Sequence, residues 1–189
     1  MGLLVITVVA DRLPSGTFVV VSGPPASGKT TVARAIAPGL GLPLIAKDTI
    51  KQALLTVLPV ADIETSRLVG TASVAALLAV AAETAGAVLE SVWHRSRALV
   101  DLRVLPGDIV EVFCRCDPEV ARQRYALRAG TRAAGHFDAD RSIDELWNDD
   151  VARPVAGGWP VIEIGTHSPV DIRSLIVLIH TAADGARRT

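Results

Sequence analysis

The stretch Gly23-Pro24-Pro25-Ala26-Ser27-Gly28-Lys29-Thr30 decides how this chain folds. It fits the pattern G-x-x-x-x-G-K-[ST], in which successive backbone N–H groups form a concave site for phosphate. Before it, residues 17–22 (TFVVVS) form an apolar, β-rich run that predicts a strand buried on both faces. After it, residues 31–37 (TVARAIA) predict a helix that ends at Pro38-Gly39. Strand, glycine-rich loop and helix follow in the order that the motif requires.

Each residue type in this loop has a chemical role. Gly23 and Gly28 tolerate backbone angles that a Cβ would hinder. The helix that begins near Gly28 adds the positive end of its dipole. The Lys29 side chain can reach the β- and γ-phosphates of a nucleotide, and the Thr30 hydroxyl is a ligand for Mg²⁺. We therefore expect the eight residues of the loop, together with Thr31, to bind a nucleoside triphosphate.

The composition indicates one globular domain. The chain has 189 residues, of which 50% are hydrophobic and 21% are charged. Its formal net charge of -1 provides no basic field to attract nucleic acid. The apolar run at residues 3–10 is much shorter than the roughly 20 residues that cross a bilayer, and it lacks the features of a signal peptide. We therefore expect a cytoplasmic protein without a membrane span.

Strand and helix signals alternate along the chain. Apolar runs of strand length occur at residues 42–46, 87–92, 109–114 and 161–164. Helical patterns lie between them, including one short helix expected over residues 142–151. This alternation predicts an α/β fold with a mostly parallel, doubly wound sheet and helices on both faces. We expect a single domain over residues 1–189, in which residues 1–16 are an N-terminal extension or add an extra strand. Ligands of such sheets bind at the carboxyl ends of the strands.

Two carboxylates fall at predicted strand ends. Asp48 follows the second strand, where it can accept a proton from a substrate hydroxyl that attacks the γ-phosphate. The alternative is a helix N-cap, which the sequence from Asp48 to Lys51 also suits. Glu90 ends the third strand in an otherwise apolar run, and a buried carboxylate needs a partner. Mg²⁺ near Thr30, held through water, would supply one; a salt-bridged or edge-facing glutamate is the alternative.

A group of arginines follows the fourth strand. Arg124 and Arg128 are four residues apart and share a helix face, from which their guanidinium groups can stabilise a transferring phosphoryl group. Arg132 comes next and is expected to face the substrate. Glycines in residues 129–141 favour a lid that closes over the site. The alternative is a solvated basic helix face, the usual meaning of a run of charges.

The acceptor side of the predicted site has weaker signals. His94 and Arg95, just beyond the third strand, are candidates for contact with the acceptor, although a lone histidine is more often structural. The stretch over residues 56–82 is strongly apolar and carries no recognisable signature. It offers few groups for a charged acceptor and favours a neutral or partly apolar compound over a nucleotide.

Taken together, these features resemble the small P-loop kinases, the nucleoside monophosphate kinase-like group that includes shikimate and gluconate kinases. The resemblance is closest to the subgroup of chloramphenicol phosphotransferase and zeta toxin, and it spans residues 18–179. It is carried by GPPASGKTT, Lys47-Asp48, Glu90, CRCDPEVARQRYALRAGTR and VIEIGTHSPVDI. It implies a P-loop NTPase three-layer sandwich with a five-stranded sheet of order 2-3-1-4-5 and a lid between the fourth and fifth strands.

The resemblance also implies an activity. ATP with Mg²⁺ would donate its γ-phosphoryl group to a hydroxyl of a small molecule, such as an antibiotic, a nucleoside or a sugar-like compound. By matching position, Asp48 resembles the base for the acceptor hydroxyl, and Arg124 and Arg128 resemble lid arginines. Thr166 and Pro169 resemble the loop that packs near the adenine.

Two other functions would use the same phosphate-binding loop. A kinase of polynucleotide or tRNA ends is disfavoured by the near-neutral charge and by the lack of a basic, aromatic surface pattern. A nucleotide-dependent ATPase switch without a small acceptor would need switch segments or an oligomerisation domain, for which the chain has no spare length. We therefore expect a monomer or homodimer whose partners are ATP or ADP and a small hydroxyl acceptor.

Overall fold

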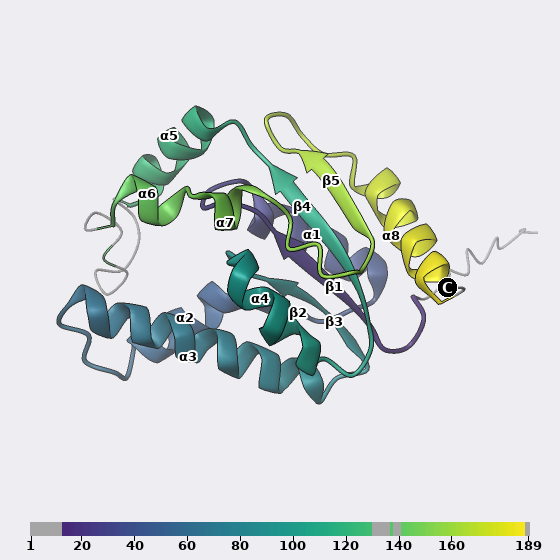
Figure 1. The fold of residues 1–189 in the computed structure, drawn as a ribbon, viewed down its shortest axis with the longest axis horizontal. Coiled ribbons are helices and arrows are strands. Elements are labelled where there is room, and N and C mark those ends of the chain that lie inside the picture. The colour runs from purple at the N-terminus through teal and green to yellow at the C-terminus, as the bar shows by residue number, and fades with distance from the viewer. Residues whose placement is uncertain (1–12, 130–136, 138–140, 188–189) are drawn as a thin grey trace, which may run out of the picture.

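The computed structural model describes residues 13–129, 137 and 141–187 (Figure 1). Its five strands form one parallel sheet in the order β2-β3-β1-β4-β5, which confirms the predicted order. The strands are β1 (Thr17–Ser22), β2 (Leu44–Ala46), β3 (Gly86–Glu90), β4 (Asp108–Arg115) and β5 (Val161–Gly165). The helices are α1 (Lys29–Leu40), α2 (Lys47–Leu55), α3 (Ile63–Ala82), α4 (Arg95–Asp101), the 3-10 helix η1 (Leu102–Val104), α5 (Pro118–Ala129), α6 (Ile143–Leu146), α7 (Asp149–Ala152) and α8 (Ile172–Ala186).

The central strand β1 divides its side chains between two cores. Phe18 and Val20 pack on one face of the sheet, and Val19 and Val21 pack on the other. All four are fully buried. A strand that is covered on both faces has no side that contacts water. Its sequence is therefore apolar throughout instead of alternating between apolar and polar residues.

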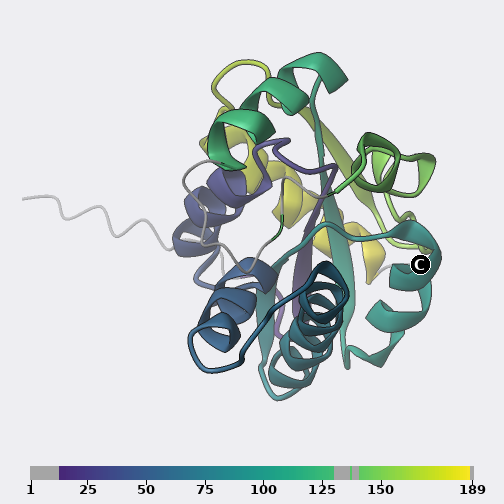
Figure 2. The ribbon, with the colours of Figure 1, turned by 90° about the vertical axis from the view of Figure 1, so that its left-hand side faces the viewer.

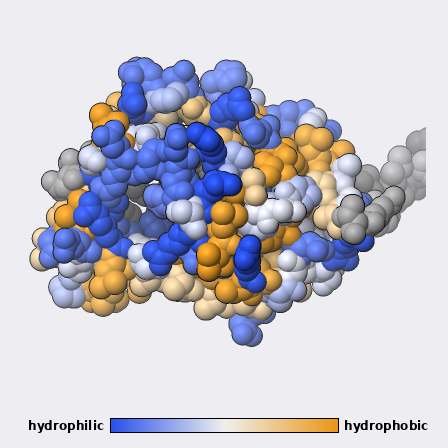
Figure 3. All heavy atoms as spheres, viewed as in Figure 1, coloured by the Kyte–Doolittle hydropathy of each residue, from blue (hydrophilic) through white to orange (hydrophobic). Residues whose placement is uncertain are grey.

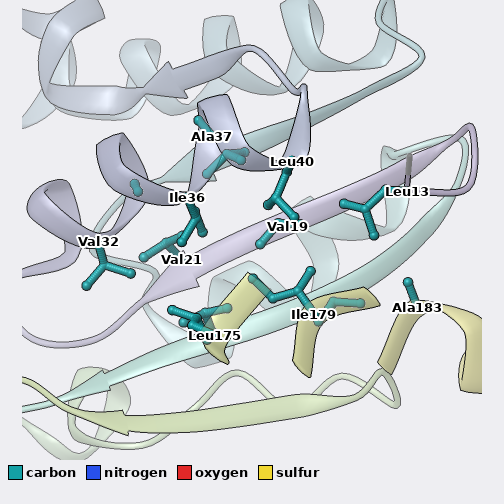
Figure 4. Close-up of a cluster of buried hydrophobic side chains, with 14 of the residues drawn as sticks. Leu13, Val19, Val21, Val32, Ile36, Ala37, Leu40, Leu175, Ile179 and Ala183 are labelled. Carbon is teal, nitrogen blue, oxygen red and sulfur yellow. The ribbon is translucent and has the colours of Figure 1, made fainter. Parts of the chain in front are cut away.

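Helices cover both faces of the sheet (Figure 1 and Figure 2). Figure 4 shows the cluster in which Ile36 of α1 and Leu175 and Ile179 of α8 pack around the strand residues Val19 and Val21. On the opposite face, residues of α3, α4 and η1 pack on the strands in a second buried cluster. The chain therefore forms the predicted three-layer α/β sandwich.

Two helix predictions need correction. α1 continues through Pro38 to Leu40, and Gly41 closes it with φ 65°. Pro38 has no N–H to donate and its ring crowds the preceding turn, but the helix still runs on to the glycine that adopts the left-handed conformation. The single helix predicted over residues 142–151 is instead the two short helices α6 and α7, separated by Trp147 and Asn148, and the Asn148 side chain caps the second.

α3 is long and apolar enough to cross a membrane by length and composition alone. It packs instead against α2 and the sheet, with Leu77 and Ala81 fully buried. A core helix passes the same test, so α3 gives no indication of a membrane protein. Residues 3–10, predicted to form an extra strand or part of an N-terminal extension, lie outside the described residues. So do Arg132 and most of the predicted lid over residues 129–141.

Candidate active site

The five strands end at one edge of the sheet, beside a cavity of about 920 Å³. It lies between α2, α3 and α4 on one side and α5 and α6 on the other, and Figure 3 shows a hydrophilic hollow in this region of the surface. The volume is near the upper end of the range for small-molecule sites. Most of the residues predicted for the active site line this cavity, as the following paragraphs describe one group at a time.

The phosphate-binding loop joins β1 to α1 through unusual backbone angles. Gly28 is the N-cap of α1 with φ 87°, and Gly23 has φ 133°. A Cβ on Gly23 would lie 2.6 Å from the carbonyl oxygen of Cys114, so no larger residue fits there. Ala26 also has a positive φ, of 59°, although it is not a glycine. Such a conformation costs about 1–3 kcal/mol and persists only where the surrounding structure enforces it.

Lys29 lies buried within this loop. Its Nζ donates a hydrogen bond of 2.7 Å to the carbonyl oxygen of Pro24. Burial lowers the pKa of Lys29, and the carboxylate charges of Glu90 and Asp48 are among the interactions that oppose this shift. The ammonium group therefore shares one small region with both carboxylates.

Glu90 and Thr30 lie together at the end of β3. Glu90 is only 5% exposed. Burial raises its pKa, while the charge of Lys29 and a hydrogen bond from the Thr30 side chain oppose the shift. The described residues contain no cluster of three His, Cys, Asp or Glu side chains that would hold a metal alone. One hydroxyl and one carboxylate nevertheless fit Mg²⁺, which commonly takes one or two protein ligands together with substrate phosphates and water.

Asp48 lies in the first turn of α2 and lines the cavity. The N-cap alternative is wrong, because α2 begins at Lys47 directly after β2 and its N-cap is Ala46. The Asp48 side chain is 44% exposed, and its Oδ1 accepts a hydrogen bond of 3.2 Å from Nζ of Lys47. A carboxylate that faces the cavity can contact a ligand there, whereas a capping carboxylate is bound to the N–H groups of its own helix.

Arg124 and Arg128 both line the cavity from α5, but they are held differently. Arg124 donates to the carbonyl oxygen of Thr166 at 3.1 Å, so it ties α5 to the loop after β5. The Arg128 guanidinium lies over the ring of Tyr125, 5.8 Å from its centroid. Burial is the main cause of the lowered pKa of Lys29, and the charge of Arg128 adds to it, so these two cationic groups lie near each other.

The loop after β5 borders the phosphate-binding loop. The Thr166 hydroxyl oxygen lies 2.7 Å from the carbonyl oxygen of Ser27 and 3.0 Å from that of Arg115. Its side chain also packs against Gly28, where an added Cβ would lie 3.4 Å from it. Thr166 thus fixes the conformation of the phosphate-binding loop. Pro169 is exposed and lines the same cavity.

Comparisons with known proteins agree with this fold. No family model matches the chain, and no curated protein matches its sequence. A solved structure from Chloroflexus aurantiacus j-10-fl, provisionally described as a kinase, is 26% identical with a TM-score of 0.78 and covers 90% of this chain and 99% of its own. The fold is that of the small P-loop kinases.

Two more distant structures share this kinase fold. A gluconokinase from Sinorhizobium meliloti 1021 is 19% identical with a TM-score of 0.58, and the match covers 93% of this chain and 94% of that one. An APS kinase from Mycobacterium tuberculosis, in complex with AMPPNP and APS, is 18% identical with a TM-score of 0.59, covering 88% and 98%. The narrower resemblance to chloramphenicol phosphotransferase and zeta toxin stays a prediction.

The acceptor side of this P-loop kinase fold differs from the sequence-based expectation. His94 lines the cavity, and its Nδ1 is 3.8 Å from Oδ2 of Asp150. Burial lowers the pKa of His94, against the opposing charge of Asp150. Arg95 begins α4 and is not among the residues that line the cavity, whereas Arg97 is.

Sequence reasoning assigned no acceptor-side role to five basic side chains that line the cavity. They are Lys47, Lys51, Arg67, Arg97 and Arg141. One signal was available for Arg67, because Arg67, Gly70, Thr71 and Val74 follow the spacing of a single helix face. Lys47 and Lys51 are likewise four residues apart in α2, whereas Arg97 and Arg141 come from other parts of the chain, and only the fold brings the five together.

Proposed function

We propose that this protein is an ATP-dependent phosphotransferase that moves the γ-phosphoryl group of ATP to a hydroxyl group of a small molecule, such as an antibiotic, a nucleoside or a sugar-like compound. One observation carries the proposal. A buried ammonium group in a phosphate-binding loop, an arginine and an exposed carboxylate converge on one cavity, in Lys29, Arg128 and Asp48. An activity that uses ATP suits the cytoplasm.

Each of these groups has a part in the reaction. The N–H groups of the phosphate-binding loop and Lys29 bind the phosphate oxygens, and Arg128 stabilises the charge that spreads over the transferring group. Asp48 accepts the proton of the acceptor hydroxyl as its oxygen bonds to the γ-phosphorus and the bond from that phosphorus to the β-phosphate oxygen breaks. Thr30 and Glu90 would hold Mg²⁺, which when bound neutralises charge on the β- and γ-phosphate oxygens.

The comparisons support this proposal. The more distant similar structures are called gluconokinase and APS kinase, and the second of these was solved with AMPPNP, a nucleotide, and with APS, a small molecule. A cavity of about 920 Å³ is large enough for the same kind of pair.

The first test is nucleotide binding. Calorimetry should detect ATP and ADP in the presence of magnesium for the wild-type chain. Lys29→Ala should lose most of this affinity and almost all turnover, because it removes the charge that faces the β- and γ-phosphates. A wild-type chain that takes up neither nucleotide would refute the proposal.

The second test separates binding from chemistry. Asp48→Asn should bind ATP as the wild type does but transfer phosphoryl groups about 10²–10⁴-fold more slowly, the usual worth of a general base. Asp184→Asn, on the exposed side of α8, is the matched control. Transfer at the parental rate by Asp48→Asn would remove its catalytic role. ADP release at the full rate without any acceptor would instead indicate a nucleotide switch.

A further inference from the structure

The cavity divides into a nucleotide half and an acceptor half. The phosphate-binding loop and the loop after β5 border the first half. The second half, which we call the acceptor chamber, is bordered by the cavity residues of α2, α3 and α4 and of the segment 141–146. Asp48 belongs to this chamber, so under the proposed function a compound bound there presents its hydroxyl group to Asp48.

α3 gives the chamber one charged side chain and a small, mostly uncharged wall. Arg67, Gly70, Thr71 and Val74 face the cavity, and only Arg67 among them carries a charge. Nζ of Lys47 lies beside this wall, 3.8 Å from where a Cβ on Gly70 would be. Arg67 precedes Gly70 by three residues, about 4.5 Å along the helix axis. Basic groups of α2 and α3 are therefore neighbours on this wall.

Basic side chains outnumber acidic ones among the described residues of the chamber. The basic ones are Lys47, Lys51, Arg67, Arg97 and Arg141. The acidic ones are Asp48, Asp101 and Glu145. Five positive charges against three negative ones leave a surplus of two positive charges, with His94 counted as neutral. A concave site with such a surplus raises the local concentration of anions.

Two arginines of the chamber share a single carboxylate. Arg67 donates to both oxygens of Glu145, with Nε 3.2 Å from Oε1 and Nη2 2.8 Å from Oε2. Nη1 of Arg141 donates to the same Oε1 at 2.8 Å. The three groups keep one positive charge in excess, and each guanidinium has further N–H donors. A carboxylate of the protein itself is thus already bound at this point, with its pKa lowered chiefly by the hydrogen bond from Arg67.

We propose that the phosphoryl acceptor carries an oxyanion, a carboxylate or a phosphate, which binds at Arg67 and Arg141 while the reacting hydroxyl lies at Asp48. This inference rests on the proposed function. It replaces the neutral acceptor expected from residues 56–82 alone, because only Arg67 among the five basic residues of the chamber comes from that stretch. The remaining four are supplied by α2, α4 and residue 141.

The test compares acceptors in pairs that differ only in the anionic group. Acceptor-dependent ADP formation is measured for gluconate and gluconamide, shikimate and its methyl ester, and glycerol 3-phosphate and glycerol. The carboxylate and phosphate arms show which oxyanion is preferred. We expect kcat/KM to be about 10-fold or more higher for the anionic member, with a KM that rises with salt. A neutral member that is equal or better overturns the inference and leaves the proposed function intact. If none of the six compounds supports ADP formation, that result counts against the proposed function itself.

Substitutions within the arginine pair sharpen this test. Arg67→Gln should raise KM for the anionic acceptor about 10- to 100-fold and leave the neutral acceptor unchanged, and Arg67→Lys should recover part of the loss. Arg153→Gln is the control, because Arg153 pairs with Asp149 and does not line the cavity. An unchanged KM in Arg67→Gln overturns the inference.

The opposite change distinguishes anion binding from a merely structural cluster. Glu145→Gln removes the internal carboxylate, so it should lower KM for the anionic acceptor several-fold. If the cluster only held the segment 141–146 on α3, both substitutions would weaken binding in the same direction, and that result overturns the inference.

Discussion

Two buried glutamates flank the central strand and have opposite surroundings. In the register of the sheet, Glu90 of β3 pairs with Val21 and Glu111 of β4 pairs with Val20, so the two carboxylates leave the sheet on opposite faces. Glu90 meets Lys29 and Thr30 at the cavity. Glu111 lies at the other face, is 0% exposed and does not line the cavity.

The partners of Glu111 account for both of its oxygens. Oε1 accepts hydrogen bonds from the Ser22 hydroxyl at 2.6 Å and from the Val155 N–H at 2.8 Å. Oε2 accepts from the Ala156 N–H at 2.9 Å and from Nε1 of Trp159 at 3.0 Å. A carboxylate satisfied by four protein donors is a structural group, whereas one that faces an ammonium group and a cavity is placed for a ligand.

The largest effect on folding is expected from Glu111→Gln. An amide cannot accept all four bonds, and it brings donors of its own toward buried N–H groups. We expect a loss of about 3–5 kcal/mol in the free energy of unfolding. Urea unfolding measures it. A loss below about 1 kcal/mol would contradict the structural role assigned to this carboxylate.

Glu90→Gln should reverse the pattern. Under the proposed function, turnover should fall about 100-fold or more, because the carboxylate that would hold Mg²⁺ is lost. The free energy of unfolding at neutral pH should stay the same or increase. Steady-state kinetics at saturating ATP and a thermal melt measure the two effects. Turnover within a factor of two of the wild type would make Glu90 as structural as Glu111.

The pH dependence of stability should report on the surroundings of Glu90. Burial raises the pKa of Glu90 above its ordinary value of 4.5, so the folded chain keeps this proton to a higher pH than the unfolded chain. Its contribution to stability is present below pH 4.5 and is lost as the pH rises through the raised pKa. The stability of Glu90→Gln relative to wild type should therefore grow with pH, by at most about 1.4 kcal/mol per pH unit. Urea unfolding in EDTA measures this difference, and parallel pH curves would contradict it.

The smallest effect is expected from Trp159→Phe. It removes one of the four bonds to Glu111 and keeps most of the ring, so stability should fall by about 1 kcal/mol with no change in turnover. Urea unfolding and kinetics on the same sample check both values. A large loss of turnover would show that the Glu111 side of the sheet is coupled to the cavity.

The contrast between the two glutamates explains how far sequence reasoning could go. The phosphate-binding loop and the strand and helix beside it depend on residues that are close in sequence, so local pattern was enough to predict them. The strand order followed from the family resemblance, and the roles assigned around Lys29 stay predictions. Glu90 and Glu111 both lie in apolar runs that look alike, AVLESV and IVEVFC. Three of the four donors to Glu111 come from residues 155–159, more than 40 residues away. The sequence around Glu111 gives no indication of these partners.

The acceptor chamber was hidden for the same reason. Its basic residues are spread from Lys47 to Arg141, and each alone looks like an ordinary surface charge. Asp48 shows that local sequence can also leave two roles open. The residues around it suit a helix N-cap as well as a catalytic base, and only the start of α2 at Lys47 excludes the cap. Chain pattern predicts where strands end, but it does not predict which side chains of distant helices meet there.

Thr166 makes the two nucleotide-side loops a single mechanical unit. Its hydroxyl contacts the backbone at Ser27, and its carbonyl oxygen accepts from Arg124. α5 therefore cannot swing away from the sheet without breaking a bond that leads straight to the phosphate-binding loop. A displacement of α5 would therefore disturb the backbone next to Lys29. Under the proposed function, a nucleotide that binds this backbone would in turn stabilise the helix that carries Arg128.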